Sequence, residues 1–261
     1  MTNSSLQRAS FSPSSELVLG SPELAKVLTY PSGDDKEYTA RLAELESLGV
    51  TAVFAGGRTV IGGTNIAGKG CVGLVVRAKV RGMATATCAL KVRRTDANRP
   101  DMLDEVKYHR IANSAGVGPR LVGHSNNFIL MEFVQGVTIA EWAHDKTIDS
   151  AKASAVARSV LEQCYALDRA GLDHGELSHA DKHVIVDDTQ ATIIDFESAS
   201  TRRKASNVSA AGQSLLVSGA IADALEQVLS SCDREATIGA LRKYKHGQSR
   251  ENFDAILALF A

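Results

Sequence analysis

The sequence predicts an α+β fold built from two lobes, the first rich in β-strands and the second mostly helical. Between residues 50 and 94, short β-branched and apolar runs alternate with turns such as Arg81-Gly82, which is typical of an antiparallel meander. Beyond about Gly136, apolar residues recur every three or four positions over long stretches, as on the buried face of a helix. This change of pattern indicates two packed units with a cleft between them.

Composition disfavours several classes of protein. The chain has 261 residues, of which 44% are hydrophobic and 23% charged, and its net charge of −1 gives no field that favours nucleic acid or a membrane surface. None of the four cysteines has C-x-x-C spacing, so we expect reduced thiols in a cytoplasmic protein. No apolar run approaches the roughly 20 residues of a membrane span. Residues 1–15 are rich in serine and lack the apolar region of a secretion signal.

Three segments are expected: a leader with a helical extension over residues 1–50, a β-rich lobe over 51–134 and a helical lobe over 135–261. In the extension, Ser21 followed by Pro22 predicts a helix that runs to about Leu28. A second helix is expected over residues 35–48, with Gly49 after its end. A DNA-binding helix-turn-helix is disfavoured because no basic recognition face is present.

The remaining elements follow from periodicity. We expect strands over residues 59–61, 72–76, 87–92 and 128–133, and a helix over 101–115. In the second half, we expect a hairpin of 184–186 with 192–194 and helices over about 150–170, 208–229, 233–245 and 250–260. Trp142 lies on an amphipathic stretch and is expected in the core.

A glycine-rich stretch begins at Gly68. With Gly70, Gly73 and Val75 it fits the pattern G-x-G-x-x-G-x-V. A dinucleotide-binding fold requires a helix after these glycines, whereas residues 74–80 resemble a strand. The stretch therefore favours a flap between two antiparallel strands, whose backbone can approach phosphate oxygens closely.

Lys91 lies on a predicted strand and shares one face with Ala89, because alternate residues of a strand point the same way. Glu105, 14 residues further on, is the expected partner that would hold its ammonium in place for phosphates. Asp101 and Asp104 are rivals for this position. Glu105 is preferred because it lies on the less charged face of its predicted helix.

Two further carboxylates, Glu176 and Asp195, flank the predicted hairpin of residues 184–186 and 192–194. The hairpin would bring them to the same end. Phosphoryl transfer uses one carboxylate near the attacking hydroxyl and another on the metal. This pair is therefore a candidate catalytic centre.

Four signals occur in this order: the glycine stretch, the strand lysine Lys91, the H-G-D-like loop that holds Glu176, and the D-F-G-like triplet that begins at Asp195. Together they resemble the motifs of the protein-kinase-like fold. The chain is most similar to the compact RIO-type kinases and the archaeal predicted serine/threonine protein kinases, over about residues 45–215. Residues 89–99, 182–186 and 195–200 carry the specific resemblance. It implies a two-lobed kinase-like fold with a β-rich N-lobe, a reduced helical C-lobe and a short N-terminal helical extension. It also implies ATP and Mg²⁺ as cofactors.

The resemblance assigns roles to individual residues. It implies nucleotide binding by Gly68, Lys69, Gly70, Cys71, Val72, Gly73, Val75, Ala89, Lys91, Glu105, Met131, Glu132 and Val134. It further implies Glu176 as the catalytic base and Asp195 as a magnesium ligand. His183 takes the place of the family's metal-binding asparagine, although magnesium prefers oxygen ligands, so Asp181 or Ser178 could substitute.

The sequence departs from the family at three motif positions. The base is Glu176 instead of aspartate, the metal-ligand position holds His183, and Glu197 replaces the glycine after Asp195-Phe196. No A-P-E segment follows, so regulation by activation-loop phosphorylation is not expected. The basic run of residues 202–204 is either a solvated turn or an anchor for a phosphate group.

By resemblance, protein serine or threonine is the expected acceptor, with an unidentified protein substrate as partner. One alternative is a small-molecule or RNA-associated kinase of the same fold. The other is a nucleotide-binding scaffold or ATPase with little transfer activity, an alternative motivated by the three departures. No membrane partner is expected.

Overall fold

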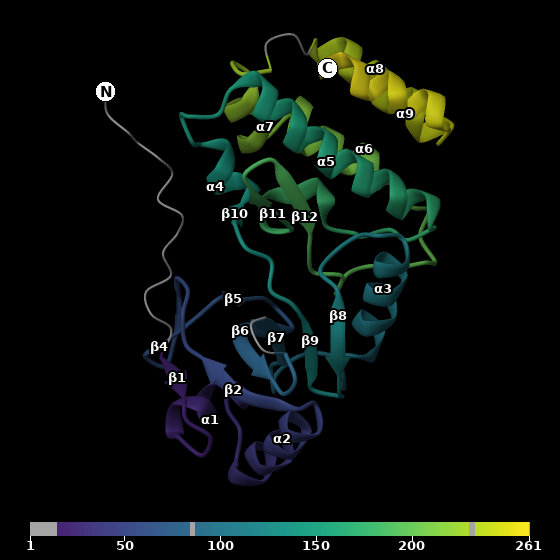
Figure 1. Cartoon of the computed structure of the whole chain (residues 1–261). Helices are drawn as coiled ribbons and strands as arrows, with labels where there is room; N and C mark the ends of the chain where they lie inside the picture. Colours follow the sequence, from purple (N-terminus) through teal and green to yellow (C-terminus); the bar gives the residue numbers. More distant parts are fainter. Residues whose placement is uncertain (1–14, 84–86, 230–232, 261) are drawn as a thin grey trace, which may run out of the picture. The chain divides into compact units, whose positions relative to one another are not determined.

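The computed structural model describes residues 15–83, 87–229 and 233–260 (Figure 1). The chain divides into two compact units. The first comprises residues 1–107 and 119–134, and the second comprises residues 108–118 and 135–261. Each unit is described by itself.

The first unit contains an antiparallel sheet with the strand order β1-β2-β6-β7-β9-β8, to which β5 adds by pairing with β6. Its strands are β1 (Glu16–Leu17), β2 (Val50–Phe54), β5 (Gly68–Lys69), β6 (Gly73–Val80), β7 (Cys88–Arg93), β8 (Leu121–His124) and β9 (Phe128–Glu132). A separate hairpin is formed by β3 (Thr59–Ile61) and β4 (Thr64–Ile66). The antiparallel β-rich region that the sequence predicts is thus confirmed.

Two strands lie outside the stretches that the sequence predicts to be β-rich. Residues 1–20 are expected to be a loose leader, but Glu16 pairs with Phe54 and makes β1 an edge of the sheet. Residues 1–14 lie outside the described part of the chain. The strand β8 has no counterpart in the prediction, because all four of its residues are half-buried and no alternation marks them.

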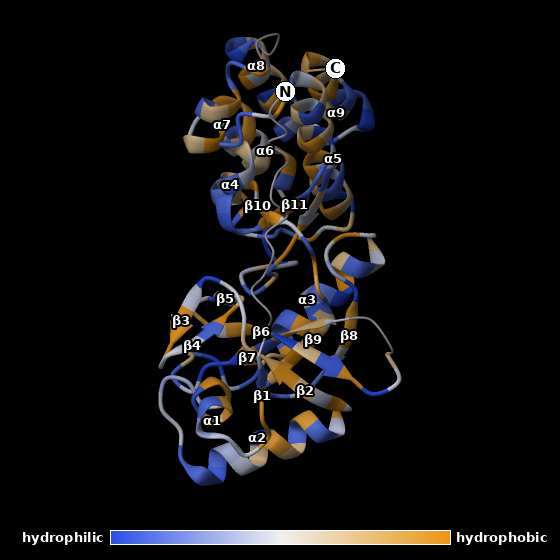
Figure 2. Ribbon diagram, turned by 60° about the vertical axis from the view of Figure 1, so that its left-hand side comes forward, coloured by the Kyte–Doolittle hydropathy of each residue, from blue (hydrophilic) through white to orange (hydrophobic). Residues whose placement is uncertain are grey.

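The two helices of the extension cover one face of this sheet. Helix α1 (Pro22–Leu28) begins with the predicted Ser21 cap, whose hydroxyl accepts from the Leu24 amide at 3.2 Å. Helix α2 (Asp35–Ser47) ends before Gly49, which has a positive φ of 72°. Figure 2 shows hydrophilic and hydrophobic residues on α2, as expected of a helix with one covered face. Their buried side chains join one apolar cluster with those of the strands, among them Leu24, Leu28, Leu45, Leu74, Val76, Leu90, Val92 and Leu130.

The opposite face of the sheet carries a different set of side chains. Directly paired residues of antiparallel strands point to the same face. Lys91 pairs with Val75 and Ile129, and Ala89 pairs with Arg77 and Met131. We call this side the lysine face, defined by these six residues. The start of helix α3 (Leu103–Ser114) packs here, since Met102 and Val106 share a cluster with Val72 and Ile129.

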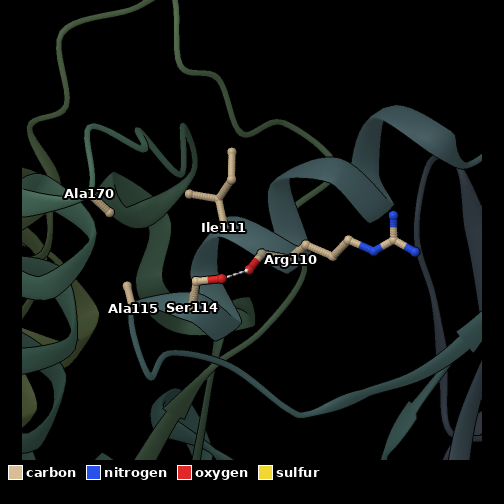
Figure 3. Close-up of a pocket in the computed structure, with 5 residues that line it drawn as sticks. All are labelled: Arg110, Ile111, Ser114, Ala115 and Ala170. Carbon is tan, nitrogen blue, oxygen red and sulfur yellow. Dashed lines mark hydrogen bonds between the residues drawn. The ribbon is translucent and has the colours of Figure 1, made fainter.

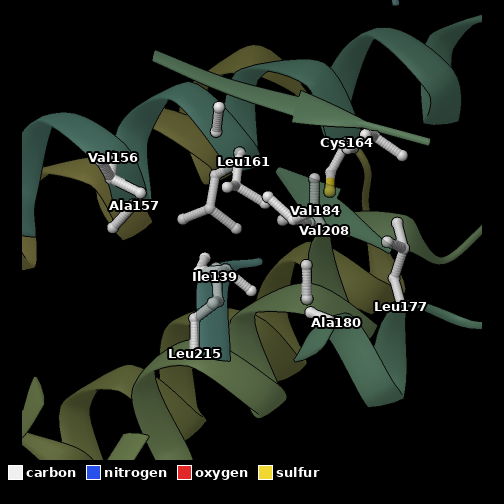
Figure 4. Packing of buried hydrophobic residues seen from close by; sticks show 14 of the residues in the cluster. Ile139, Val156, Ala157, Leu161, Cys164, Leu177, Ala180, Val184, Val208 and Leu215 are labelled. Atoms are coloured by element: carbon white, nitrogen blue, oxygen red, sulfur yellow. The ribbon is translucent and has the colours of Figure 1, made fainter. Parts of the chain in front are cut away.

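The second unit is mainly helical around a small antiparallel sheet of order β10-β11-β12. Its elements include β10 (Val137–Thr138), α4 (Ile139–Ala143), α5 (Ser150–Arg169), the 3₁₀ helix η1 (Leu177–Lys182), β11 (Val184–Asp187), β12 (Gln190–Ile193), α6 (Asn207–Gly212), α7 (Ala220–Leu225), α8 (Arg234–His246) and α9 (Arg250–Leu257). The core gathers Val156, Leu161, Cys164, Leu177, Val184 and Val208 (Figure 4). Trp142 is buried there, as predicted.

The single helix predicted over residues 208–229 is wrong. After α6 the chain forms a π-helical turn (Gln213–Val217), and it is extended at Ser218, with φ −157° and ψ 147°. Gly219 has a φ of 110°, which no helical residue adopts. The chain therefore changes direction before α7 begins. The apolar periodicity persists because both short helices bury one face in the same core.

A buried carboxylate connects three helices of the second unit. Asp168 of α5 accepts hydrogen bonds from the Asn207 amide and side chain, both at 2.8 Å, and from the Tyr244 hydroxyl of α8 at 3.0 Å. Burial raises the pKa of Asp168. Asn207 also binds the Leu172 carbonyl at 2.7 Å, so this network fixes the chain just before His174.

Among the described residues, no helix has the length and apolar character needed to cross a bilayer. Among the described residues, Cys71, Cys88 and Cys164 are free cysteines. Cys232 lies outside the described residues.

We expect Leu161→Ala to lower the free energy of unfolding by about 2–5 kcal/mol, because it opens a cavity in a closed apolar core. Urea denaturation would measure this loss. Arg158→Ala, on the exposed side of the same helix, is the matched control and should change stability by less than about 0.5 kcal/mol. Equal effects of the two substitutions would contradict the packing described here.

Candidate active site

The glycine stretch forms a hairpin. Gly68 pairs with Val75 and Lys69 with Leu74, and the Gly70 amide donates to the Gly73 carbonyl at 2.8 Å. A strand follows the glycines, as expected for a flap and not for a dinucleotide-binding turn.

Gly73 faces the lysine at close range. A Cβ atom at this position would lie 3.0 Å from both the Cγ atom of Lys91 and the carbonyl oxygen of Val92. Glycine therefore leaves space for the Lys91 side chain, whereas a Cβ atom here would press on that side chain and on the Val92 backbone.

Residues from other parts of the first unit bind the turn of the glycine hairpin. The Lys69 ammonium donates to the Tyr30 hydroxyl at 2.7 Å, and the Arg94 guanidinium donates to the Gly70 carbonyl at 3.1 Å. Cys71 is exposed at the tip. Sequence reasoning missed Tyr30 and Arg94, because contacts over such chain distances leave no periodic signal.

Lys91 and Glu105 form a buried ion pair. The Nζ atom of Lys91 lies 2.8 Å from one carboxylate oxygen of Glu105 and 3.0 Å from the other. Of the rivals, Asp101 accepts from the Leu103 amide at 3.0 Å, and Asp104 is exposed. The pairing expected from the sequence is therefore present. Two desolvated charges of this kind depend on each other, because removing one leaves the other uncompensated.

Several other residues that the sequence predicts to bind the nucleotide lie on or near the lysine face. Val75, Ala89 and Met131 lie on it with Lys91. Glu132 is the last residue of β9, and Val134 lies two residues further on.

Arg77 on this face was not anticipated. Its guanidinium lies 4.4 Å from the centroid of the Phe133 ring, and burial lowers its pKa. Its position opposite Ala89 follows from the strand register, which the sequence does not reveal.

In the second unit, Asp195 follows β12 with a left-handed backbone, at a φ of 69°. A non-glycine residue rarely adopts this conformation, and such strain is concentrated at functional positions. The Nδ1 atom of His183 lies 3.7 Å from a carboxylate oxygen of Asp195. The Ile194 amide donates to the His183 carbonyl at 2.9 Å, which holds the two residues together.

The buried side chain of His174 contacts His183, Ile194 and Phe196. Its Nε2 atom donates to the Ile194 carbonyl at 3.0 Å, and its ring packs edge-on against His183 and Phe196. Burial lowers the pKa of His174 to about 4, although the charges of Asp195 and Glu176 both act to raise it. Glu176 is two residues after His174, and Asp195 follows Ile194, so this ring joins the segments that carry the two carboxylates.

Glu176 itself stands at the start of η1 and is half-buried. Its carbonyl accepts from the His179 amide at 2.9 Å. Ser178 is exposed and Asp181 is half-buried on the same short helix. Strands β11 and β12 form the predicted hairpin, in which Val184 pairs with Ile193, but β12 begins at Gln190 and ends one residue before Ile194.

The donor set at Asp195 can be compared with the needs of magnesium. The carboxylate of Asp195 fits a hard cation. The buried Nδ1 atom of His183 has no hydrogen-bond partner and faces this carboxylate, but an imidazole nitrogen is a poor magnesium ligand. Asp195 is therefore a suitable magnesium ligand, whereas His183 is a weak one.

The basic run after Asp195 is partly engaged. Arg203 binds Asp173 at 2.7 Å and the Ser198 carbonyl at 2.5 Å, and Lys204 donates to the Lys245 carbonyl at 3.3 Å. Arg202 is exposed.

A hollow of about 300 Å³ lies elsewhere in the second unit (Figure 3). It is lined by Arg110, Ile111, Ser114, Ala115 and Ala170. None of these is a residue that the sequence assigns to the site.

Residues 81–209 match the family model of the RIO domain. This stretch is a RIO-type, kinase-like domain. It contains Lys91, Glu105, Glu176, His183 and Asp195, whereas the glycine hairpin precedes it. The antiparallel sheet and the helices agree with a two-lobed kinase-like fold, which confirms the predicted fold class. RIO proteins are atypical kinases and ATPases, so this domain is of an ATP-binding, phosphotransferase type. None of the curated proteins matches the chain.

The lowered pKa of His174 predicts an acid-sensitive fold. The ring takes up a proton near pH 6.5 when unfolded but only near pH 4 when folded. The unfolded state therefore binds more protons between these values, and stability should fall by up to about 3 kcal/mol as the pH drops through this window. Urea denaturation at several pH values, with EDTA present, would measure the loss.

Two variants make this test specific. His174→Gln cannot titrate there and should give a flatter profile, while exposed His144→Gln should keep the wild-type slope. An unchanged acid slope in His174→Gln would show that other groups cause the loss.

Proposed function

We propose that this protein is an ATP- and magnesium-dependent phosphotransferase whose favoured acceptor is a serine or threonine hydroxyl of a protein. The observation that carries the proposal is the buried Lys91–Glu105 pair of the RIO-type domain, which lies beside the glycine hairpin that precedes this domain. The favoured location is the cytoplasm.

In this proposal Lys91 binds the α- and β-phosphates of ATP, and Glu105 keeps its ammonium in place. The backbone of Gly68, Gly70 and Gly73 covers the phosphates. Ala89, Met131 and the chain at Glu132–Val134 bind the adenine. Removing water around the ammonium strengthens its attraction for the phosphate charge.

Asp195 would hold the metal, with His183, Asp181 or Ser178 as the second ligand. A bound magnesium ion would supply neutralisation of phosphate charge. Glu176 would accept the hydrogen bond of the acceptor hydroxyl and orient it. His174 keeps the turn before Asp195 in place through the Ile194 carbonyl.

His183 supports a second candidate function. By resemblance, its imidazole stands where the family has an oxygen ligand, and a nitrogen there would hold magnesium less tightly than efficient transfer requires. The protein would then act as a nucleotide-binding scaffold or as an ATPase.

We expect Lys91→Ala to lower transfer from labelled ATP at least about 100-fold, the usual effect of removing a group that stabilises developing charge. Lys79→Ala, an exposed lysine on β6, is the matched control and should keep wild-type activity. Because Lys91→Ala removes the ion-pair partner of Glu105 and could disturb the fold, Asp195→Asn provides a second variant of nearly unchanged shape. Activity of both variants equal to wild type would refute the proposal.

The acceptor class needs a separate assay. Purified protein with labelled ATP would be offered its own chain, generic proteins, RNA-bound proteins and hydroxyl metabolites. Labelling of protein serine or threonine supports the favoured acceptor. Phosphate release without any labelled product would support the ATPase.

A further inference from the structure

The extension helix α2 reaches the turn between β8 and β9 through Glu44. Its carboxylate accepts from the Asn127 amide at 3.1 Å, from the Asn127 side chain at 2.6 Å and from the Ser125 hydroxyl. Glu44 and Asn127 are 83 positions apart, so this contact joins distant parts of the first unit.

A second residue of α2 completes the contact. The side chain of Arg41 is fully buried, and it donates to the side-chain oxygen of Asn127 at 3.3 Å and to the Leu28 and Arg93 carbonyls, both at 2.5 Å. Glu37 balances its charge at 2.7 Å. An apolar residue would cover the sheet without the cost of burying a guanidinium, so coverage alone does not explain this side chain.

The turn of residues 125–127 also binds the two elements that carry the Lys91–Glu105 pair, strand β7 and helix α3. The Asn127 side chain accepts from the Arg93 guanidinium at 2.9 Å, two positions after Lys91 on β7. The carbonyl of Asn126 accepts from the Met102 amide at 3.0 Å, directly before the helix that carries Glu105.

One further bond closes the network. The Arg93 guanidinium donates to the Arg99 carbonyl at 3.0 Å, in the segment between β7 and α3. The strand of the ammonium and the helix of the carboxylate are thus both attached to residues 125–127, which α2 holds in place.

We propose that Arg41, Glu44 and Asn127 are positioning residues that fix the Lys91–Glu105 pair, so that the N-terminal extension is a working part of the nucleotide site. Its consequence for ATP rests on the function proposed above. A network of satisfied polar groups specifies one geometry, whereas apolar packing tolerates small shifts.

The experiment compares Asn127→Ala with Leu45→Val in the full chain. Leu45 lies on α2 and contributes only apolar packing to the sheet, so it controls for loss of stability. Two quantities are measured where circular dichroism shows each variant folded: the reductive methylation rate of Lys91 relative to Lys79, and the affinity for ATP.

In Asn127→Ala we expect Lys91 methylation to rise several-fold and ATP affinity to fall about tenfold, equivalent to about 1.4 kcal/mol. Leu45→Val, at a similar loss of stability, should change neither. Glu44→Gln tests the same network if Asn127→Ala does not fold. Equal methylation and affinity in the network and control variants would overturn the proposal.

The experiment distinguishes failure of the proposed function from failure of the positioning proposal. If the wild-type protein binds no ATP, the proposed function is refuted, and the methylation rates then decide alone. Faster methylation of Lys91 in Asn127→Ala would still support positioning by the network, and an unchanged rate would overturn it.

Discussion

The first unit depends on the ion pair between Lys91 and Glu105. Two charges taken out of water are costly unless each has its partner at hydrogen-bond distance, so strand β7 and helix α3 must meet in one geometry. The surrounding structure supplies that geometry. Met102 and Val106 pack α3 onto the sheet, and Gly73 leaves space for the lysine.

In the second unit, the comparable constraint is the unusual backbone conformation of Asp195. Asp195 keeps a left-handed backbone that an isolated chain would rarely adopt, so its neighbours must hold it. The buried ring of His174 does this through the Ile194 carbonyl, and Asn207 accepts from the His174 amide at 2.9 Å. Asp168 anchors Asn207 in turn. A polar relay thus runs from the helical core to the strained turn.

Local patterns were sufficient to predict much of this arrangement. Strand alternation and the less charged helix face led to the Lys91–Glu105 pair, and cap residues located α1 and α2. The break at Gly219 was missed because apolar periodicity continues across it. Contacts such as Arg41 with Asn127, 86 positions apart, depend on tertiary structure and leave no sequence period. The second metal ligand stays a prediction, because side-chain chemistry alone does not choose among His183, Asp181 and Ser178.

The glycines of the hairpin are not equivalent. The nearest atom to a Cβ added at Gly68 would be 4.0 Å away, in ordinary contact, whereas one at Gly73 would meet Lys91 and Val92 at 3.0 Å. Neither residue has a positive φ, so available volume, and not backbone freedom, separates them. Relatives should therefore accept alanine or serine at the first motif position but retain glycine at the third. A pattern search that weights all three alike would overlook true members of the group.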